Sequence, residues 1–178
     1  DSVHMMIISP DEGGMGRAVY FANVLGLDMG MFYKRRDYST IVNGKNPIVA
    51  HEFLGADVRG KDLLIIDDMI ASGESMLEVA AHLKARGARK IFACATFGLF
   101  TNGLKKFDDA YENGIIDHVL TTNLTYQTPE LLEKAWYINC DMSKYIAYII
   151  DTLNHDISTS KVINPTDKIR ELLAKRGL

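Results

Sequence analysis

The sequence predicts an α/β fold in which helices cover both faces of a mostly parallel β-sheet. Strand-like and helix-like segments alternate along the chain, and this order is typical of such sheets. Residues 63–66, LLII, are apolar throughout, as expected for a strand that is buried on both faces. With 178 residues, 47% of them hydrophobic, the chain can bury one sizeable core. We therefore expect one compact three-layer domain.

The first third of the chain is expected to contain two strands and one helix. The strands cover residues 4–9 and 29–33. The helix between them has apolar residues at the spacing of a single helix face, namely Ala18, Phe21, Ala22 and Leu25. Gly26 is expected to end it. Residues 34–47 are polar and irregular, so we expect a long loop, with a hairpin at the Asn-Gly pair 43–44 as an option.

A strand, a loop and a helix follow in direct succession. The strand covers residues 62–67, and the helix carries an apolar stripe that consists of Met76, Val79, Ala80 and Leu83. Gly87 is expected to end this helix. Further strands are expected at residues 90–96, 117–123 and 136–140, with short helices at 103–114 and from Pro129 onward.

The carboxyl-terminal part shows one more helical stripe, formed by Ile146, Ile149, Ile150 and Leu153. The last segment has a capping signal at Thr166 ahead of a short amphipathic run. We expect a domain over residues 1–160 and a carboxyl-terminal extension with a short helix over residues 161–178.

Composition narrows the classes of function. The net charge of −3 gives no basic excess for nucleic-acid binding. The sequence contains no run of 18 apolar residues, which would be needed for a membrane-spanning helix. Cys94 and Cys140 are far apart and show no metal-ligand spacing, so we expect reduced thiols in a cytoplasmic protein. Because the chain enters a strand almost at once and does not begin with methionine, we expect Asp1 to lie within a longer protein.

The loop after strand 62–67 has the composition of a phosphate-binding turn. We call residues 71–75 the phosphate loop; its members are Ala71, Ser72, Gly73, Glu74 and Ser75. Small residues leave backbone amides accessible at the start of a helix, where the helix dipole favours an anion. Gly73 permits a turn conformation that strains other residues, and the serine hydroxyls can donate to phosphate oxygens. The alternative is a purely structural role, in which these residues cap a helix that follows an acidic strand end.

Two carboxylates precede this loop, those of Asp67 and Asp68. Ionised carboxylates only accept hydrogen bonds, so neighbouring sugar hydroxyls suit them as donors. A ribose phosphate has both a phosphate group and a diol, so it is the ligand that such a pair of neighbouring sites would bind. The lysine of a Walker-type nucleotide site is missing from the loop.

These residues carry a family resemblance. Residues 65–75, IIDDMIASGES, resemble the ribose 5-phosphate motif of the type I phosphoribosyltransferase superfamily. Four blocks in family-like order resemble the carboxyl-terminal half of the ribose-phosphate pyrophosphokinases, at residues 8–18, 33–38, 60–75 and 87–100. The likeness is looser after Asn123. It implies a sheet of type I phosphoribosyltransferase type and Mg²⁺-dependent transfer of diphosphate from ATP to ribose 5-phosphate, giving phosphoribosyl diphosphate and AMP.

The resemblance also implies roles for three residues outside the phosphate loop. Lys34 and Arg36 match the family's catalytic lysine and arginine on a flexible loop, where they would stabilise charge on the transferred group. Asp11 matches a family Mg²⁺ ligand, and oxygen ligands suit that cation. Taken alone, the basic run is typical of a solvated turn, and Asp11 is equally suited to capping a helix. We expect Arg17 to form a structural ion pair.

Two departures from the family pattern affect this hypothesis. Ala71 stands where the synthetases usually have an acid, and Phe97 stands where they have histidine. The family's amino-terminal half supplies a metal-binding histidine, and the adenine pocket is completed at a subunit interface, so this chain alone is expected to be inactive. The resemblance implies a homo-oligomer, either a dimer or a hexamer. The rival hypotheses are a phosphoribosyltransferase that uses phosphoribosyl diphosphate as donor, and a non-catalytic regulatory homologue.

Overall fold

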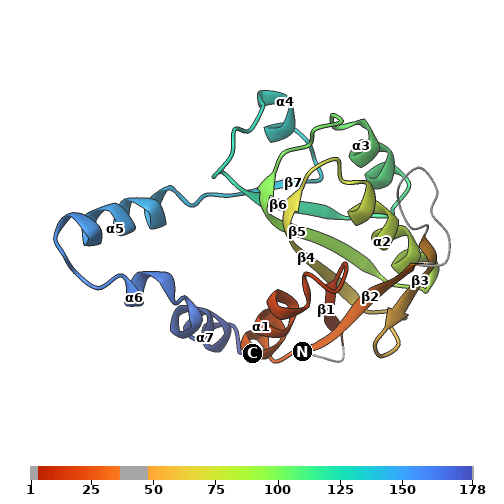
Figure 1. Cartoon of the computed structure of the whole chain (residues 1–178), viewed down its shortest axis with the longest axis horizontal. Helices are drawn as coiled ribbons and strands as arrows, with labels where there is room; N and C mark the ends of the chain where they lie inside the picture. The colour runs from red at the N-terminus through yellow and green to blue at the C-terminus, as the bar shows by residue number, and fades with distance from the viewer. Residues whose placement is uncertain (1–3, 37–47, 178) are drawn as a thin grey trace.

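The computed structural model describes residues 4–36 and 48–177 of the chain. Within these residues one seven-stranded sheet forms, with the strand order β3-β2-β1-β4-β5-β6-β7 (Figure 1). Its neighbouring strands are parallel except for the β2/β3 pair. The strands are β1 (Met5–Ser9), β2 (Asp28–Arg36), β3 (Ile48–Leu54), β4 (Asp62–Ile70), β5 (Lys90–Gly98), β6 (His118–Thr122) and β7 (Tyr137–Cys140).

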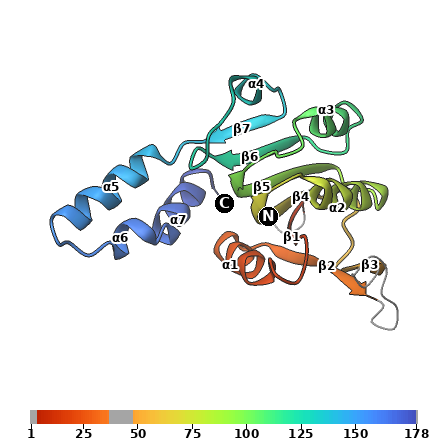
Figure 2. The same ribbon diagram turned by 45° about the horizontal axis from the view of Figure 1, so that its top comes forward.

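Helices lie on both sides of the sheet. Figures 1 and 2 show α2 and α3 on one side and α1 on the other, which gives the three layers that the sequence predicts. The helices are α1 (Met15–Leu25), α2 (Glu74–Ala85), α3 (Lys105–Glu112), α4 (Pro129–Leu132), α5 (Ser143–Asn154), α6 (Ser160–Ile163) and α7 (Thr166–Lys175). No helix in the described ranges has both the length and the apolar character needed to cross a bilayer.

The core confirms that the central strands are buried on both faces. In β1, Met6 and Ile8 belong to the larger cluster, which includes α2 and α3 residues, whereas Ile7 packs with α1. Strand β4 alternates in the same way, with Ile65 in the larger cluster and Ile66 in the smaller one. Since successive side chains of a strand point to opposite faces, a continuous apolar run is needed to fill both layers.

The β2/β3 hairpin corrects the expectation of a long loop from residue 34. Strand β2 continues to Arg36, and β3 pairs with it antiparallel, from Met31 opposite Leu54 to Arg36 opposite Ile48. Backbone hydrogen bonds to a neighbouring strand can hold polar residues in an extended conformation, and a periodicity argument does not detect this. The Asn-Gly pair at residues 43–44 lies outside the described residues.

The carboxyl-terminal helices extend from the sheet as an arm. Both views show α5 leaving the end of β7 and pointing away from the sheet, while α7 returns beside α1 (Figures 1 and 2). Helix α7 begins at Thr166 rather than being capped by it: Pro165 is the N-cap residue, and the Thr166 amide donates to Asn164 Oδ1 at 3.1 Å. The Thr166 hydroxyl lies 3.4 Å from the Tyr20 hydroxyl of α1. The domain boundary at residue 160 stays a prediction.

Candidate functional site

The phosphate loop joins β4 to α2 at the carboxyl edge of the sheet, as the sequence predicts. Strand β4 extends to Ile70, so Asp67 and Asp68 belong to the strand itself. Helix α2 begins at Glu74, with Gly73 as its N-cap in the left-handed conformation at φ +80°. The free amides of the first helical turn and the helix dipole therefore lie directly after the two carboxylates.

Gly73 is required by space as well as by conformation. A β-carbon at this position would lie only 2.2 Å from Cζ of Phe107, which is fully buried in α3. Phe107 in turn packs edge-on against Phe100 and stacks on Trp136, with ring centroids 5.1 and 5.4 Å apart. The phosphate loop thus packs against an aromatic cluster of Phe100, Phe107 and Trp136. The sequence alone does not predict this contact.

The charges around the loop are partly compensated. Lys106 at the start of α3 forms an ion pair with Glu74. This pair lowers the pKa of the Glu74 carboxyl. The Ser72 hydroxyl oxygen accepts a hydrogen bond from the Glu74 amide at 3.4 Å. Because Lys106 offsets the carboxylate, an acidic residue in the phosphate loop does not leave an unpaired negative charge there.

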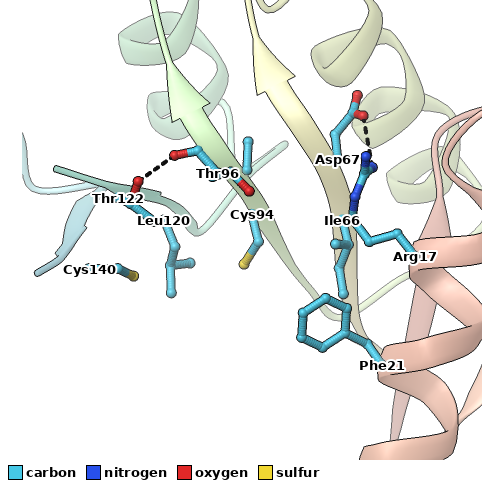
Figure 3. Close-up of a pocket in the computed structure, with 10 residues that line it drawn as sticks. Arg17, Phe21, Ile66, Asp67, Cys94, Thr96, Leu120, Thr122 and Cys140 are labelled. Atoms are coloured by element: carbon cyan, nitrogen blue, oxygen red, sulfur yellow. Dashed lines mark hydrogen bonds and ion pairs between the residues drawn. The ribbon is translucent and has the colours of Figure 1, made fainter. Parts of the chain in front are cut away.

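The two carboxylates differ in environment, and Arg17 connects them. Arg17 donates to Asp67 Oδ1 at 3.3 Å (Figure 3). Its second terminal nitrogen lies 3.6 Å from Asp68 Oδ2. The Asp67 side chain is 27% exposed and that of Asp68 is 65% exposed. Arg17 therefore forms the ion pair that we expected, and it does so with both predicted diol ligands.

The pKa shifts separate the roles of this pair. Burial raises the pKa of Asp67, and the charges of Asp68 and Asp11 act in the same direction. The pKa of Asp68 is lowered, chiefly by its hydrogen bond with Asp67 and further by the Arg17 charge. Asp68 is consequently the exposed carboxylate that ionises more readily, which suits an acceptor for sugar hydroxyls. Asp67 is the half-buried member that holds Arg17.

Asp11 lies in the turn between β1 and α1, at the same edge of the sheet. Its Oδ1 accepts a hydrogen bond from the Gly14 amide at 3.0 Å, and this is the contact expected if Asp11 caps the helix. Among the described residues, no group of three or more His, Cys, Asp or Glu side chains could hold a metal ion. A single carboxylate is still enough for Mg²⁺ when phosphates and water supply the other oxygens. Asp11 as a ligand stays a prediction.

Lys34 and Arg36 lie in β2, not in a loop. Their backbones pair with His51 and Ile48 of β3, and the register shifts between residues 35 and 36. Their side chains are outside the described part of the structure, so their catalytic role stays a prediction. The parallel β1/β2 pairing places the end of β2 at the same edge of the sheet as Asp11.

A hollow of about 190 Å³ lies beside the carboxylates, on the α1 side of the sheet (Figure 3). Arg17 and Asp67 border it, together with Cys94, Leu120 and Cys140. Both cysteines are free, as expected. Cys94 and Cys140 lie two strands apart and two residues out of register, so their Cα atoms are roughly 12 Å apart, too far for a disulfide.

Comparison with known proteins assigns the class. Residues 3–133 match the model of the phosphoribosyl transferase domain, and the chain belongs to that family. The expected likeness to the ribose-phosphate pyrophosphokinases is confirmed. The enzyme of that name from Vibrio parahaemolyticus is 31% identical over 160 residues, which are 89% of this chain and 48% of the relative. The one from Thermococcus kodakarensis is 34% identical over 131 residues, which are 72% of this chain and 44% of the relative.

A solved structure supports the fold. The crystal structure of phosphoribosylpyrophosphate synthetase from Mycobacterium smegmatis superposes with a TM-score of 0.71 at 24% identity, covering 85% of this chain and 45% of that chain. The chain thus spans about half the length of the pyrophosphokinases that it matches. The sheet and its helices are therefore of type I phosphoribosyltransferase type.

Proposed function

We propose that this chain is the ribose 5-phosphate-binding half of a Mg²⁺-dependent ribose-phosphate pyrophosphokinase that uses ATP as donor. The observation that carries the proposal is the β4–α2 unit. Its Asp68 is exposed, has a lowered pKa and lies just before the start of α2, where Gly73 is the N-cap residue. The 31% identity to a ribose-phosphate pyrophosphokinase over 89% of this chain supports the same reading.

The geometry divides the substrate into two parts. The 5-phosphate would lie against the amides of residues 71–75, where the α2 dipole stabilises negative charge. The ribose diol would lie against Asp68, with Asp67 and Arg17 holding that carboxylate in place. The two parts of the proposed site come from β4, the turn after it and the start of α2, with Arg17 added from α1, and all of these residues are described.

The chemistry is a displacement at phosphorus. The 1-hydroxyl oxygen of ribose 5-phosphate bonds to the β-phosphorus of ATP, the bond from that phosphorus to the oxygen of the α-phosphate breaks, and AMP leaves as the hydroxyl proton is released. Such a step depends on in-line positioning and charge stabilisation. Lys34 and Arg36 would supply positive charge to the transferred group. Asp11 would hold Mg²⁺, which neutralises phosphate charge when it is bound.

Calorimetric titration tests the division of the site. Ribose 5-phosphate should bind the wild-type chain, and Asp68→Asn should weaken that binding while the affinity for inorganic phosphate stays the same. Glu78→Gln, an exposed change on the same helix as the phosphate loop, provides a charge-matched control. If Asp68→Asn weakens both ligands equally, or neither, the carboxylate does not contact the sugar.

A further inference from the structure

The connection from β5 to α3 contains a strained residue beside the phosphate loop. Among the described residues other than glycine, only Phe100 and Asp156 have a positive φ, at +46° and +52°. This conformation is unfavourable for a bulky side chain, and residues held in it are concentrated at functional sites. Asp156 is exposed in the turn after α5, whereas Phe100 is only 8% exposed and follows the end of β5 by two residues. The conformation of Phe100 therefore needs a structural reason.

Three successive amides around Phe100 donate hydrogen bonds to the entrance of the phosphate loop. The amides of Leu99 and Phe100 both donate to the Ile70 carbonyl oxygen, at 2.9 and 3.4 Å. The Thr101 amide donates to the Ala71 carbonyl oxygen at 2.9 Å. Ile70 is the last residue of β4, and Ala71 is the first residue of the phosphate loop. Since β4 pairs with β5 up to Ile70, these bonds continue the contact past the end of both strands.

These bonds set the direction of two amides that the proposed function assigns to the 5-phosphate. In a planar trans peptide unit, the carbonyl oxygen and the amide hydrogen point in opposite directions. The Ile70 carbonyl shares its peptide unit with the Ala71 amide, and the Ala71 carbonyl shares its unit with the Ser72 amide. Because both carbonyls point toward residues 99–101, both amides point away from that segment. Two donors of the phosphate loop are thereby held in fixed directions.

The Phe100 ring holds this backbone in place. It packs edge-on against Phe107 and Tyr137, with ring centroids 5.1 and 6.3 Å apart, and its centroid lies 6.0 Å from that of Trp136. Phe107 is also the side chain that approaches Gly73 further along the phosphate loop. The aromatic cluster therefore contacts the loop at Gly73 and, through Phe100, fixes the backbone that binds its entrance. Leaving the left-handed conformation would disrupt the packing of a buried ring.

We infer that Phe100 is a positioning residue for the 5-phosphate, because its packing maintains a strained backbone that orients amides of the phosphate loop. It acts through Ile70 and Ala71 and does not contact the substrate itself. A set of donors that is already oriented binds an anion more tightly than one that must be ordered on binding. The inference rests on the proposed function and adds to it a residue outside the phosphate loop on which phosphate affinity depends.

Three variants, each titrated calorimetrically with inorganic phosphate and with ribose 5-phosphate, test this role. Phe100→Ala removes the ring but keeps a β-carbon, so the backbone should relax and the affinity for both ligands should fall about tenfold, the worth of one hydrogen bond to a charged group. Phe100→Gly also removes the ring, but glycine is not strained at φ +46°, so it should bind both ligands several times more tightly than Phe100→Ala. Asp156→Ala, at the other strained position, is the matched control and should bind like the wild-type chain.

The order of the two Phe100 variants separates positioning from packing. If Phe100 only filled the core, both variants would lose the same ring and Phe100→Gly would bind no better than Phe100→Ala. Equal affinities of the two variants would therefore overturn the inference. Wild-type affinity in Phe100→Ala would overturn it as well and leave the phosphate site intact, whereas a wild-type chain that binds neither ligand would overturn the proposed function together with it.

Hydrogen exchange of the wild-type chain decides the inference even if a variant fails to fold. Since coupling is reciprocal, a hydrogen bond that favours the phosphate-binding loop is itself stabilised when phosphate binds. The Thr101 amide, which donates to Ala71, should therefore exchange more slowly in saturating inorganic phosphate. The Asn113 amide at the end of α3, which donates to Asp109, should exchange at an unchanged rate. The same rate at Thr101 with and without phosphate would overturn the inference.

Discussion

Gly73→Ala should lower the stability of the folded chain and distort the backbone of the phosphate loop. At φ +80° a residue with a β-carbon is strained by about 1–2 kcal/mol. The new carbon would also lie 2.2 Å from Phe107, and overpacking of this kind costs about 1–3 kcal/mol. The sum is about 2–5 kcal/mol, which corresponds to a fall in the melting temperature of about 4–20 °C for a chain of this size.

Gly103→Ala is the matched control for this experiment. Gly103 also has a positive φ, at +77°, but a β-carbon there would meet no atom within 4 Å. Only the conformational cost of about 1–2 kcal/mol should remain. Adding Phe107→Leu to Gly73→Ala should restore part of the lost stability, with a coupling of about 1 kcal/mol or more in a double-mutant cycle. Equal thermal shifts for Gly73→Ala and Gly103→Ala would refute the role of Phe107.

Three further predictions concern the basic residues, the thiols and the chain alone. Lys34→Ala, in a longer form of the protein that makes phosphoribosyl diphosphate, should lower kcat about 10²–10³-fold without changing the melting temperature; normal turnover would remove Lys34 from the mechanism. Burial raises the pKa of Cys94 to about 12, so at pH 8 only about one molecule in ten thousand carries the thiolate. A disulfide reagent should therefore label Cys140 first and Cys94 much more slowly, and two equally fast thiols would contradict this. The isolated 178 residues should release no AMP from ATP in the presence of ribose 5-phosphate, because exposed charge contacts of about 1 kcal/mol or less cannot replace a closed nucleotide pocket; steady AMP release would show that the catalytic site is complete.

The local sequence was sufficient to predict the β4–α2 unit. The apolar run ahead of Asp67, the glycine at the turn and the stripe of α2 are all features of neighbouring residues, and the structure has each of them where it was expected. Interactions between distant segments were harder to predict. Strand β3 is extended because β2 lies beside it, and Phe107 reaches Gly73 from α3, 34 positions further along the chain.

The stripe of α5 shows a different limit of sequence reasoning. The spacing of Ile146, Ile149, Ile150 and Leu153 correctly predicts a helix with one apolar side. It does not say what that side packs against, and in the described structure Ile146, Ile150 and Leu153 of the stripe are exposed. Arg17 is similar, because an ion pair was expected but its two partners, Asp67 and Asp68, became evident only from the fold.

Nuclear magnetic resonance titration with ribose 5-phosphate tests the central claim most directly. In amide correlation spectra of the chain, signals of residues 71–75 and of Asp67 and Asp68 should shift in a saturable way. Inorganic phosphate should shift the signals of residues 71–75 and leave Asp68 nearly unchanged, since it offers no sugar hydroxyls. Shifts confined to other parts of the sheet, or no saturable shift with ribose 5-phosphate, would contradict a ribose 5-phosphate site at the start of α2.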